Sequence, residues 1–305
     1  MSDTTPSDLL SIGTAVSELQ TEFPEMSHSS LRFLEREGLV TSTRTAGGHR
    51  LYSRADIDRV ALIKRWQRQG LSLDEIRELL ARRDALPSPS GLAQEFLLLV
   101  LDQNLEQAQR LILGADEAGL DPATLFFDVL RPVLIEVGDM WAAGTLSVHQ
   151  EKEISSICRE LVTELTLRHS PPYPQGPLLI SACVEGERHE IGLAMVNGLL
   201  RQQGYRVRYL GPDVATRFLL DSILANRPAA VLLSATLESN VATCVEAIDA
   251  IEAAFAPEPP PVTILVGGRA TDVHYQEIER RGGIPVRADD ALRSVDSLLS
   301  QGLSS

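Results

Sequence analysis

The sequence has few cysteines and no long apolar run. Its three cysteines, Cys158, Cys183 and Cys244, form no C-x-x-C pair, so they provide neither a disulfide framework nor a zinc knuckle. We predict three small core residues in a reducing compartment. No stretch approaches the ~18 apolar residues that span a bilayer, and the N-terminus has no secretory signal. We therefore expect a soluble, cytoplasmic protein with no membrane partner.

Positive charge is scarce overall but concentrated near the N-terminus. The 305 residues include 28 Lys and Arg against 42 Asp and Glu, a net charge of −14, which excludes a chain that coats nucleic acid over its whole surface. Between Ser30 and Gly70, however, nine basic side chains accompany only four acidic ones. One face of this region is a candidate for phosphate contacts, although a solvated arginine-rich helical surface would have the same composition.

Two proline-containing spacers divide the chain into three parts. They lie at Ala85–Gly91 and Ser170–Gly176, where proline and glycine cannot continue a helix. A third proline-rich run, Pro257–Pro261, is interpreted as a loop inside the last part. We predict a multidomain α and α/β protein with a winged helix-turn-helix at 8–84, a four-helix-type bundle at 91–170 and a doubly wound, Rossmann-like domain at 177–303.

The first part has the pattern of short helices followed by a hairpin. Apolar residues from Ile12 to Leu19 follow the 3.6-residue period, and a second short helix stops at Gly38. Gly47 and Gly48 suit a hairpin turn, from which Arg44, Arg50 and Tyr52 would project toward phosphates. Two further helices are predicted to begin at the N-caps Ser53 and Ser72, the second with a capping box.

Helical and then strand patterns continue along the chain. Apolar spacing predicts bundle helices over Ala93–Leu113, Ala123–Trp141 and Val148–Leu167. Short apolar runs separated by helical stretches then predict a parallel sheet, in which ligands bind at the carboxyl ends of the strands. The predicted strands are Leu178–Val184, Arg206–Leu210, Ala230–Ser234, Val262–Val266 and one near Ile284.

The loop after the first of these strands, Glu185–Gly192, contains the most distinctive polar residues. It has neither a G-x-G-x-x-G nor a G-K-[ST] sequence, which disfavours dinucleotide and P-loop sites. It does carry His189 two residues after Glu187. A histidine in such a loop can present one nitrogen to a metal while the other donates to a carboxylate. A lone histidine is otherwise commonly a helix-cap or surface residue.

Several motifs of the first part resemble the winged helix-turn-helix of MerR-type regulators. They are SIGTAVSEL, SSLRFLEREGLV, RTAGGHRLYSRADIDRVALI and QGLSLDEIRELL, spread over about 75 residues. The resemblance implies that the protein binds operator double-stranded DNA. It assigns Ser29, Ser30 and Arg32 to the recognition helix and Arg50 and Tyr52 to the wing.

Four motifs of the last part resemble the cobalamin-binding module of methionine synthase and corrinoid proteins. They are E-x-H-x-x-G at 187–192, Leu210–Asp213, Ser234–Thr236 and Gly267–Gly268. The resemblance implies a cobalamin cofactor with His189 as the lower axial ligand of cobalt. The residues that it assigns to the cofactor are Glu187, Gly192, Gly211, Asp213, Ser234, Thr236, Gly267 and Gly268. Of these, Gly192 lets the first helix start close to the nucleotide tail, and Gly267 and Gly268 remove side chains where the tail passes. The hydroxyl groups of Ser234 and Thr236 lie at the end of a strand.

The bundle resembles that of light-responsive MerR regulators of the CarH type, in which nine residues separate a Trp from a Glu-His pair. The resemblance makes Trp141 the lid over the upper ligand and Glu151 an acceptor for an adenosyl ribose. Two positions depart from the pattern. Ala142 replaces a histidine that ligates cobalt after photolysis, which leaves His149 as a candidate light-state ligand, and Lys152 replaces the histidine of the pair. Adenosylcobalamin is the expected form, with methylcobalamin, aquocobalamin or an additional bilin as alternatives.

Together the resemblances imply a cobalamin-dependent, light-responsive transcriptional repressor. It would hold operator DNA as a homo-oligomer, a dimer or a tetramer, and photolysis of the Co–C bond would change the oligomer and its affinity for DNA. We expect no enzymatic activity, because no acid–base pair or nucleophile is arranged for catalysis. The alternatives are a non-photochemical tetrapyrrole or redox sensor, which Ala142 leaves open, and a corrinoid methyl carrier, against which the winged domain argues.

Overall fold

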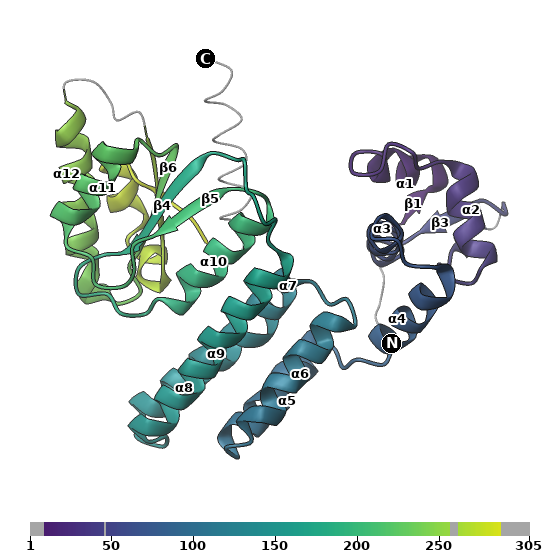
Figure 1. The fold of residues 1–305 in the computed structure, drawn as a ribbon, viewed down its shortest axis with the longest axis horizontal. Helices are drawn as coiled ribbons and strands as arrows, with labels where there is room; N and C mark the ends of the chain where they lie inside the picture. The colour runs from purple at the N-terminus through teal and green to yellow at the C-terminus, as the bar shows by residue number, and fades with distance from the viewer. Residues whose placement is uncertain (1–8, 46, 257–261, 288–305) are drawn as a thin grey trace. The chain divides into compact units, whose positions relative to one another are not determined.

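The computed structural model describes residues 9–45, 47–256 and 262–287. Its residues form two compact units (Figure 1). One comprises the residues up to Leu86 together with Glu117–Gly119, and the other comprises Pro87–Asp116 and the residues from Leu120 onward. The predicted domain limits at residues 8 and 303 and the proline-rich run 257–261 lie outside the described residues. We describe each unit separately.

The first unit has the helices and the hairpin predicted for a winged helix-turn-helix. Its three short strands form an antiparallel sheet in the order β1-β3-β2. Both predicted N-caps are confirmed, because Ser53 and Ser72 each form a capping box. The elements are β1 (Leu10–Ser11), α1 (Ile12–Leu19), α2 (His28–Arg36), β2 (Thr43–Arg44), β3 (Arg50–Tyr52), α3 (Arg54–Arg68) and α4 (Leu73–Asp84).

The bundle differs from its prediction at one point. The single helix expected over Ala93–Leu113 is wrong, because the structure has α5 (Pro89–Leu101) and α6 (Leu105–Glu117) on either side of a turn. Gln103, in that turn, has φ 61°, a left-handed conformation that a continuing helix cannot include. Apolar residues on both sides of the turn keep the same spacing, which hid the break from the sequence pattern.

The other two predicted bundle helices are present. The second consists of α7 (Pro122–Thr124), a π-helical turn η2 (Leu125–Leu130) and α8 (Arg131–Ala142). Proline in the first turn of α8 removes one backbone donor at this junction. The third helix is α9 (Val148–His169), which begins at a capping box of Ser147.

The α/β domain has the predicted parallel sheet, with strands in the order β5-β4-β6-β7-β8. This order is that of a doubly wound, flavodoxin-like sheet, in which ligands bind where the order reverses. Its elements are β4 (Leu178–Cys183), α10 (Ile191–Gln202), β5 (Arg206–Tyr209), α11 (Thr216–Asn226), β6 (Ala230–Ser234), η3 (Glu238–Asn240), α12 (Val241–Phe255), β7 (Thr263–Gly267), η4 (Arg269–Asp272), α13 (Tyr275–Arg280) and β8 (Ile284–Pro285).

Helices cover both faces of this sheet. Apolar residues of α10 pack on one face, against alternate residues of β4 and β6, and residues of α11, α12 and α13 pack on the other face. The prediction that Cys158, Cys183 and Cys244 are core residues is confirmed, because all three are buried and unpaired. Among the described residues, no helix combines the length and apolar character that a bilayer span requires.

Helix α9 of the bundle packs directly on α10 of the α/β domain. The two helices lie close together at Gly198, where an added Cβ would collide with Thr166 Oγ1 of α9 and lie 3.4 Å from Phe126 Cε2 of η2. Gly192, on the same helix, has no described atom within 4 Å of the corresponding position. The absence of a side chain at Gly198 therefore allows the close packing of the bundle on the α/β domain.

This contact predicts that the same substitution has different effects on stability at two glycines of α10. Gly198→Ala is expected to lower the free energy of unfolding by about 1–3 kcal/mol through overpacking. Gly192→Ala is the matched control and should be neutral or stabilising by up to ~1 kcal/mol, because alanine favours a helix. Denaturant unfolding of the cofactor-free protein measures both. Equal effects at the two positions would contradict the assigned packing.

Candidate functional site

The candidate site lies at the carboxyl edge of the sheet, where the loops after β4, β5 and β6 meet. The loop after β4 carries Glu187 and His189. In the sheet, β4 pairs with β6 in parallel register up to Cys183 and Ser234. Because β4 and β6 are the strands at which the order of connections reverses, the site occupies the expected ligand position of the fold.

Glu187 is the centre of the hydrogen-bond network at this edge. Its side chain is fully buried. One carboxylate oxygen accepts from the backbone N–H of His189 at 2.8 Å and from Nδ1 of the His189 ring at 2.6 Å. The other accepts from the backbone N–H groups of Thr236 and Leu237 at 2.6 and 3.2 Å and from the Asn240 side chain at 3.0 Å. One carboxylate therefore joins the loops after β4 and β6.

The same contacts determine the protonation of both residues. Burial by itself would raise the pKa of Glu187, but the hydrogen bonds from His189, Asn240 and the backbone outweigh it and lower the pKa to about 2. The pKa of His189 is raised, chiefly by its hydrogen bond to Glu187. An ionised carboxylate can only accept, so the proton of neutral His189 lies on Nδ1. Its Nε2 then carries the free lone pair that a metal requires.

The position of the ring suits a ligand that faces solvent. The His189 side chain is 57% exposed although its partner Glu187 is buried. No described residue hydrogen-bonds to Nε2. A buried carboxylate on one nitrogen and an open second nitrogen form the arrangement of a metal-binding histidine, in which the carboxylate fixes the tautomer and raises the basicity of the ligand.

The loop after β5 supports the histidine loop from the other side. Asp213 Oδ1 accepts from the backbone N–H of Gly186 at 2.7 Å, and the backbone N–H of Asp213 donates to the carbonyl of Glu187 at 2.8 Å. Asp213 and Gly211 have positive φ angles of 55° and 111°. The predicted Leu210–Asp213 motif is thus brought next to the histidine loop by a backbone turn.

Small residues line the face of the sheet beside the histidine. Cys183, Ser234 and Gly267 are register partners across β4, β6 and β7. Side chains alternate along a strand, so these three lie on the face that α10 covers, the face to which Leu179 and Leu232 also belong. Ser181 lies on this face as well, and its Oγ is buried without a described hydrogen-bond partner. Small side chains and an unpartnered buried hydroxyl on one face of the sheet fit the polar nucleotide tail of a cofactor.

Two of the predicted glycines have different surroundings. Gly268 has φ 118°, and a Cβ there would collide with the backbone of Ala235. Gly192 faces space that no described atom occupies. Gly268 is therefore required for the close approach of two loops, whereas Gly192 leaves an opening at the start of α10. Thr236 contributes its backbone N–H to Glu187, and none of the described hydrogen bonds involves its hydroxyl.

The bundle has exposed apolar side chains, and a charged pair on α9 lies near the histidine. Trp141 is 48% exposed and Val148 is 59% exposed. Glu151 accepts from Ser155 Oγ at 2.7 Å and pairs with Lys152 Nζ at 2.9 Å. Both charges of this pair act on the pKa of His189, so the first turn of α9 lies within electrostatic range of the imidazole. The predicted acceptor Glu151 therefore lies beside the candidate site, and the predicted lid Trp141 is exposed near the end of α8.

His149 lies on a different side of the same turn. Two residues correspond to about 200° around an α-helix, so His149 points away from the side that carries Glu151. Its Nδ1 lies 3.0 Å from Ser147 Oγ at the helix N-cap. His149 would have to leave this arrangement to act as a cobalt ligand.

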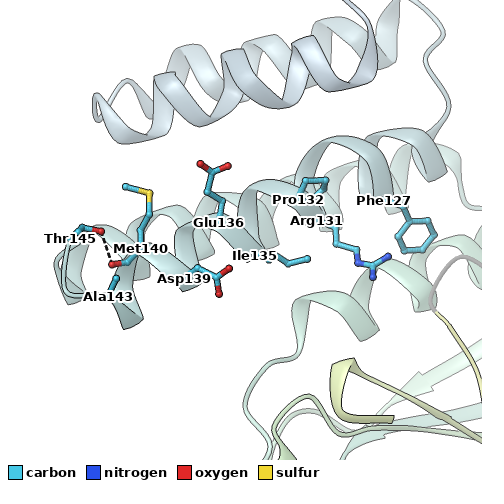
Figure 2. Close-up of a pocket in the computed structure, with 9 residues that line it drawn as sticks. All are labelled: Phe127, Arg131, Pro132, Ile135, Glu136, Asp139, Met140, Ala143 and Thr145. Atoms are coloured by element: carbon cyan, nitrogen blue, oxygen red, sulfur yellow. Dashed lines mark hydrogen bonds between the residues drawn. The ribbon is translucent and has the colours of Figure 1, made fainter. Parts of the chain in front are cut away.

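A shallow groove of about 680 Å³ follows α8 (Figure 2). Phe127, Arg131, Ile135, Asp139 and Met140 are among the residues that line it. Asp139 also lies 3.9 Å from Arg269 in η4, directly after Gly268. The groove thus adjoins the loop that follows the Gly267–Gly268 pair, and its charged residues were not anticipated from the sequence.

The predicted DNA-binding residues divide into two groups. Ser29 and Arg32 on α2 and Arg44 on β2 are exposed, and Ser30 beside them is half-buried. The expectation that Tyr52 projects from the wing is wrong: its side chain is 1% exposed. Arg50 and Tyr52 share one face of β3, which packs on the helices, and Arg50 is paired with Glu35 at 2.7 Å. Tyr52 is a core residue in this structure.

Sequence analysis missed three residues that support the site. Asn240 follows the carboxyl end of β6 and donates to Glu187, and Glu190 and Tyr209 bond each other at 2.8 Å beside His189. The available signal was position: Asn240 follows one strand at this edge, and Tyr209 ends another. No local motif marks them, because each acts through a partner far away in the chain.

The Glu187–His189 pair predicts how the stability of the cofactor-free protein depends on pH. The lowered pKa of Glu187 stabilises the fold above its ordinary value of 4.5, and this stabilisation is lost as pH falls toward about 2. The raised pKa of His189 stabilises the fold below its ordinary value of 6.5 and ceases to do so as pH rises through the raised value. Glu187→Gln should therefore reduce the free energy of unfolding most between these two ordinary values.

Denaturant unfolding of the wild type and Glu187→Gln across pH 3–8 measures this difference, with Glu160→Gln on the exposed face of α9 as the control. A deficit of about 1–3 kcal/mol is expected at its maximum, because the substitution leaves buried donors poorly paired. A deficit that does not vary with pH would contradict the assigned protonation states.

Family profiles match all three parts of the chain. The MerR HTH family regulatory protein profile matches residues 12–83, and a MerR DNA-binding profile matches residues 57–113. Two B12 binding domain profiles match residues 92–166 and 177–295, which cover the bundle and the α/β domain. All three parts of the chain are therefore recognised in the predicted order.

Individual relatives cover most of the chain. The HTH-type transcriptional repressor CarH of Myxococcus xanthus is 30% identical over 260 residues, which are 80% of this chain and 85% of that protein. The repressor CarA of the same organism is 28% identical over 275 residues, 88% of this chain and 91% of that protein. The structure of the Methanosarcina barkeri monomethylamine corrinoid protein matches the fold with a TM-score of 0.59 at 18% identity, covering 68% of this chain and 98% of that one. The chain belongs to the MerR-type, cobalamin-binding transcriptional regulators of the CarH and CarA kind.

Proposed function

We propose that this regulator is a light-responsive repressor that holds adenosylcobalamin between its bundle and its α/β domain. The observation that carries the proposal is the buried Glu187 carboxylate, which fixes His189 with Nε2 open toward the exposed side of the loop. That arrangement occurs in a chain that also carries a winged helix-turn-helix. A cobalt ligand and a DNA reader in one polypeptide favour a regulator over an enzyme.

The residues divide the binding of the cofactor among them. His189 would bind cobalt from below, and the row of Cys183, Ser234 and Gly267 would receive the nucleotide tail, with the unpaired Ser181 hydroxyl as a further partner. Trp141 and Val148 would cover the upper side, where burial of their exposed apolar surface favours binding by roughly 25 cal/mol per Å². The bound cofactor would supply a cobalt–carbon bond that light can break.

The upper side differs from the family pattern in a way that affects the signal. Ala142 offers no ligand, and the Lys152 ammonium neutralises Glu151, which already accepts from Ser155. Glu151 retains lone pairs for a ribose hydroxyl, because a carboxylate accepts about four hydrogen bonds. Adenosylcobalamin therefore remains the proposed form, and methylcobalamin, aquocobalamin or an additional bilin are the alternatives to be compared with it.

Two other functions are less well supported. A corrinoid methyl carrier would use the same bundle and α/β domain, but it has no need of the winged domain. A non-photochemical tetrapyrrole or redox sensor would use all three parts. Ala142 favours such a sensor if the light state requires a second protein ligand to cobalt. Illumination distinguishes the sensor from the photoreceptor.

The proposed response acts through DNA affinity. An oligomer that presents several weak winged domains together binds an operator far more tightly than one domain does. We propose that the dark form is such a homo-oligomer, a dimer or a tetramer, and that loss of the upper ligand shifts the bundle and weakens the assembly. Operator DNA would then be released without a change in any DNA-contacting side chain.

The test compares protein loaded with adenosylcobalamin in the dark and after green light. Absorption spectra, size-exclusion chromatography and operator-binding titrations are measured on both samples. We expect bleaching of the alkyl-cobalt band, a smaller particle and at least 10-fold weaker DNA binding. Uptake of the cofactor with no light-dependent change in size or DNA affinity would favour the sensor and contradict the photoreceptor.

Arg32 provides a prediction for the winged domain. It is exposed on α2, in the region where basic side chains are concentrated, so Arg32→Ala should weaken operator binding in the dark form. If Arg32 contacts a phosphate, the negative slope of log K against log salt should become smaller in magnitude by about one. Arg110→Ala, an exposed arginine of the bundle, is the matched control. Identical titrations for wild type and Arg32→Ala would exclude this placement, and cobalamin uptake should be unchanged in both variants.

A further inference from the structure

Two acidic residues lie close to His189 in the chain, and their carboxylates have different partners. Glu187 holds the imidazole ring. Glu190 precedes α10, but its side chain makes no capping hydrogen bond to that helix. Its carboxylate instead accepts from Tyr209 Oη at 2.8 Å and lies 3.0 Å from Arg159 Nε. Glu190 thus ties the backbone next to His189 to the sheet and to the bundle at once.

Tyr209 provides the fixed end of this connection. It is the last residue of β5 and is in register with Ser181 of β4. Burial, followed by the neighbouring Cys183 and Glu190, raises the pKa of the phenol, so its hydroxyl remains a donor at neutral pH. Cys183 Sγ lies 4.0 Å from Tyr209 Oη and 4.0 Å from the carbonyl oxygen of His189. Tyr209 is therefore tied to Glu190 directly, and Cys183 lies between Tyr209 and the backbone of His189.

Arg159 provides the end that belongs to the bundle. It lies on α9 between Glu151, whose charge acts on His189, and Thr166, which packs against Gly198. At 1.5 Å per residue, Arg159 lies about 10 Å along the helix from Thr166, and Glu151 lies about 22 Å along it from the same residue. A rotation of α9 about its contact with Gly198 would therefore move Arg159 about half as far as Glu151.

Such a rotation would change the distance between Arg159 and Glu190. Glu190 is only 20% exposed, so a partial loss of its partners leaves a carboxylate poorly solvated. Widening the gap between Glu151 and His189 would stretch the contact between Arg159 and Glu190. The Arg159–Glu190 ion pair thus opposes changes in the distance between the bundle and the α/β domain, where a flat cofactor would bind.

We propose that Glu190 and Tyr209 are positioning residues for the cobalt ligand His189, and that Arg159 links this positioning to the bundle. The proposal deepens the function proposed above and rests on it, because it assumes that cobalamin occupies the gap. Glu187 orients the imidazole ring. The linked side chains of Arg159, Glu190 and Tyr209 fix the position of the loop that carries the ring relative to the sheet and the bundle. A residue with a merely structural role would change stability without changing cobalt ligation.

The test uses three substitutions in the full-length protein: Tyr209→Phe, Glu190→Gln and Arg159→Met. Tyr275→Phe, at an exposed tyrosine, and Glu160→Gln, next to Arg159 on α9, are the matched controls. Two quantities are measured on protein uniformly labelled with nitrogen-15. The first is the dissociation constant for hydroxocobalamin, from absorption titrations. The second is the fraction of bound cob(II)alamin that His189 ligates, from the two-line nitrogen-15 splitting in its electron paramagnetic resonance spectrum, which differs from the three-line splitting of the unlabelled cofactor base. His189→Ala defines the spectrum without histidine ligation.

Tyr209→Phe and Glu190→Gln should each weaken binding about 10-fold and lower the His189-ligated fraction, as expected for residues that orient a metal ligand. Arg159→Met should retain ligation but weaken binding by a smaller factor, because it frees the bundle and not the loop. The control variants should match the wild type. Glu190→Asp keeps the charge but shortens the side chain, and it replaces Glu190→Gln if that variant does not fold.

Unchanged affinity and unchanged ligation in Tyr209→Phe and Glu190→Gln would overturn this inference while leaving the proposed function intact. A wild-type protein that binds no cobalamin would instead contradict the proposed function itself. Reduced thermal stability accompanied by normal ligation would show that these residues only support the fold, and it would also overturn the proposal.

Discussion

The buried carboxylate of Glu187 accepts five hydrogen bonds, and the arrangement of the site follows from them. A carboxylate without solvent contact must have its lone pairs satisfied, so the loops after β4 and β6 are held where their N–H groups can reach it. The same requirement puts the His189 proton on Nδ1 and leaves Nε2 open. A single electrostatic constraint thus determines loop geometry, tautomer and the direction of the free nitrogen.

The surroundings of this pair extend the constraint to the bundle. Glu190 connects the histidine loop to Tyr209 of the sheet and to Arg159 of α9, and Gly198 allows α9 to lie close to α10. The first turn of α9, with Glu151, then lies within electrostatic range of the imidazole. These contacts support the proposal that the bundle and the α/β domain form two sides of one cofactor site.

The fold could be predicted from the sequence wherever the pattern is local. Apolar periodicity located the parallel strands, and Ser53 and Ser72 marked helix starts. The break at Gln103 was missed because an unchanged apolar spacing masks a single left-handed residue. Tyr52 was misjudged because strand alternation fixes only that it shares a face with Arg50, and tertiary packing decides that this face is buried. His189 and Glu187 carried a motif, whereas Asn240 and Tyr209 reach the site only through the folding of distant segments.

The central claim, that Glu187 presents His189 Nε2 to cobalt, is tested most directly with isotopically labelled protein. Protein uniformly labelled with nitrogen-15 is loaded with unlabelled cobalamin, reduced to cob(II)alamin and examined by electron paramagnetic resonance. Ligation by His189 predicts that each cobalt line splits into two, because the nucleus of nitrogen-15 has spin one half. Splitting into three would show that the nitrogen-14 base of the cofactor remains bound to cobalt, and it would contradict the account.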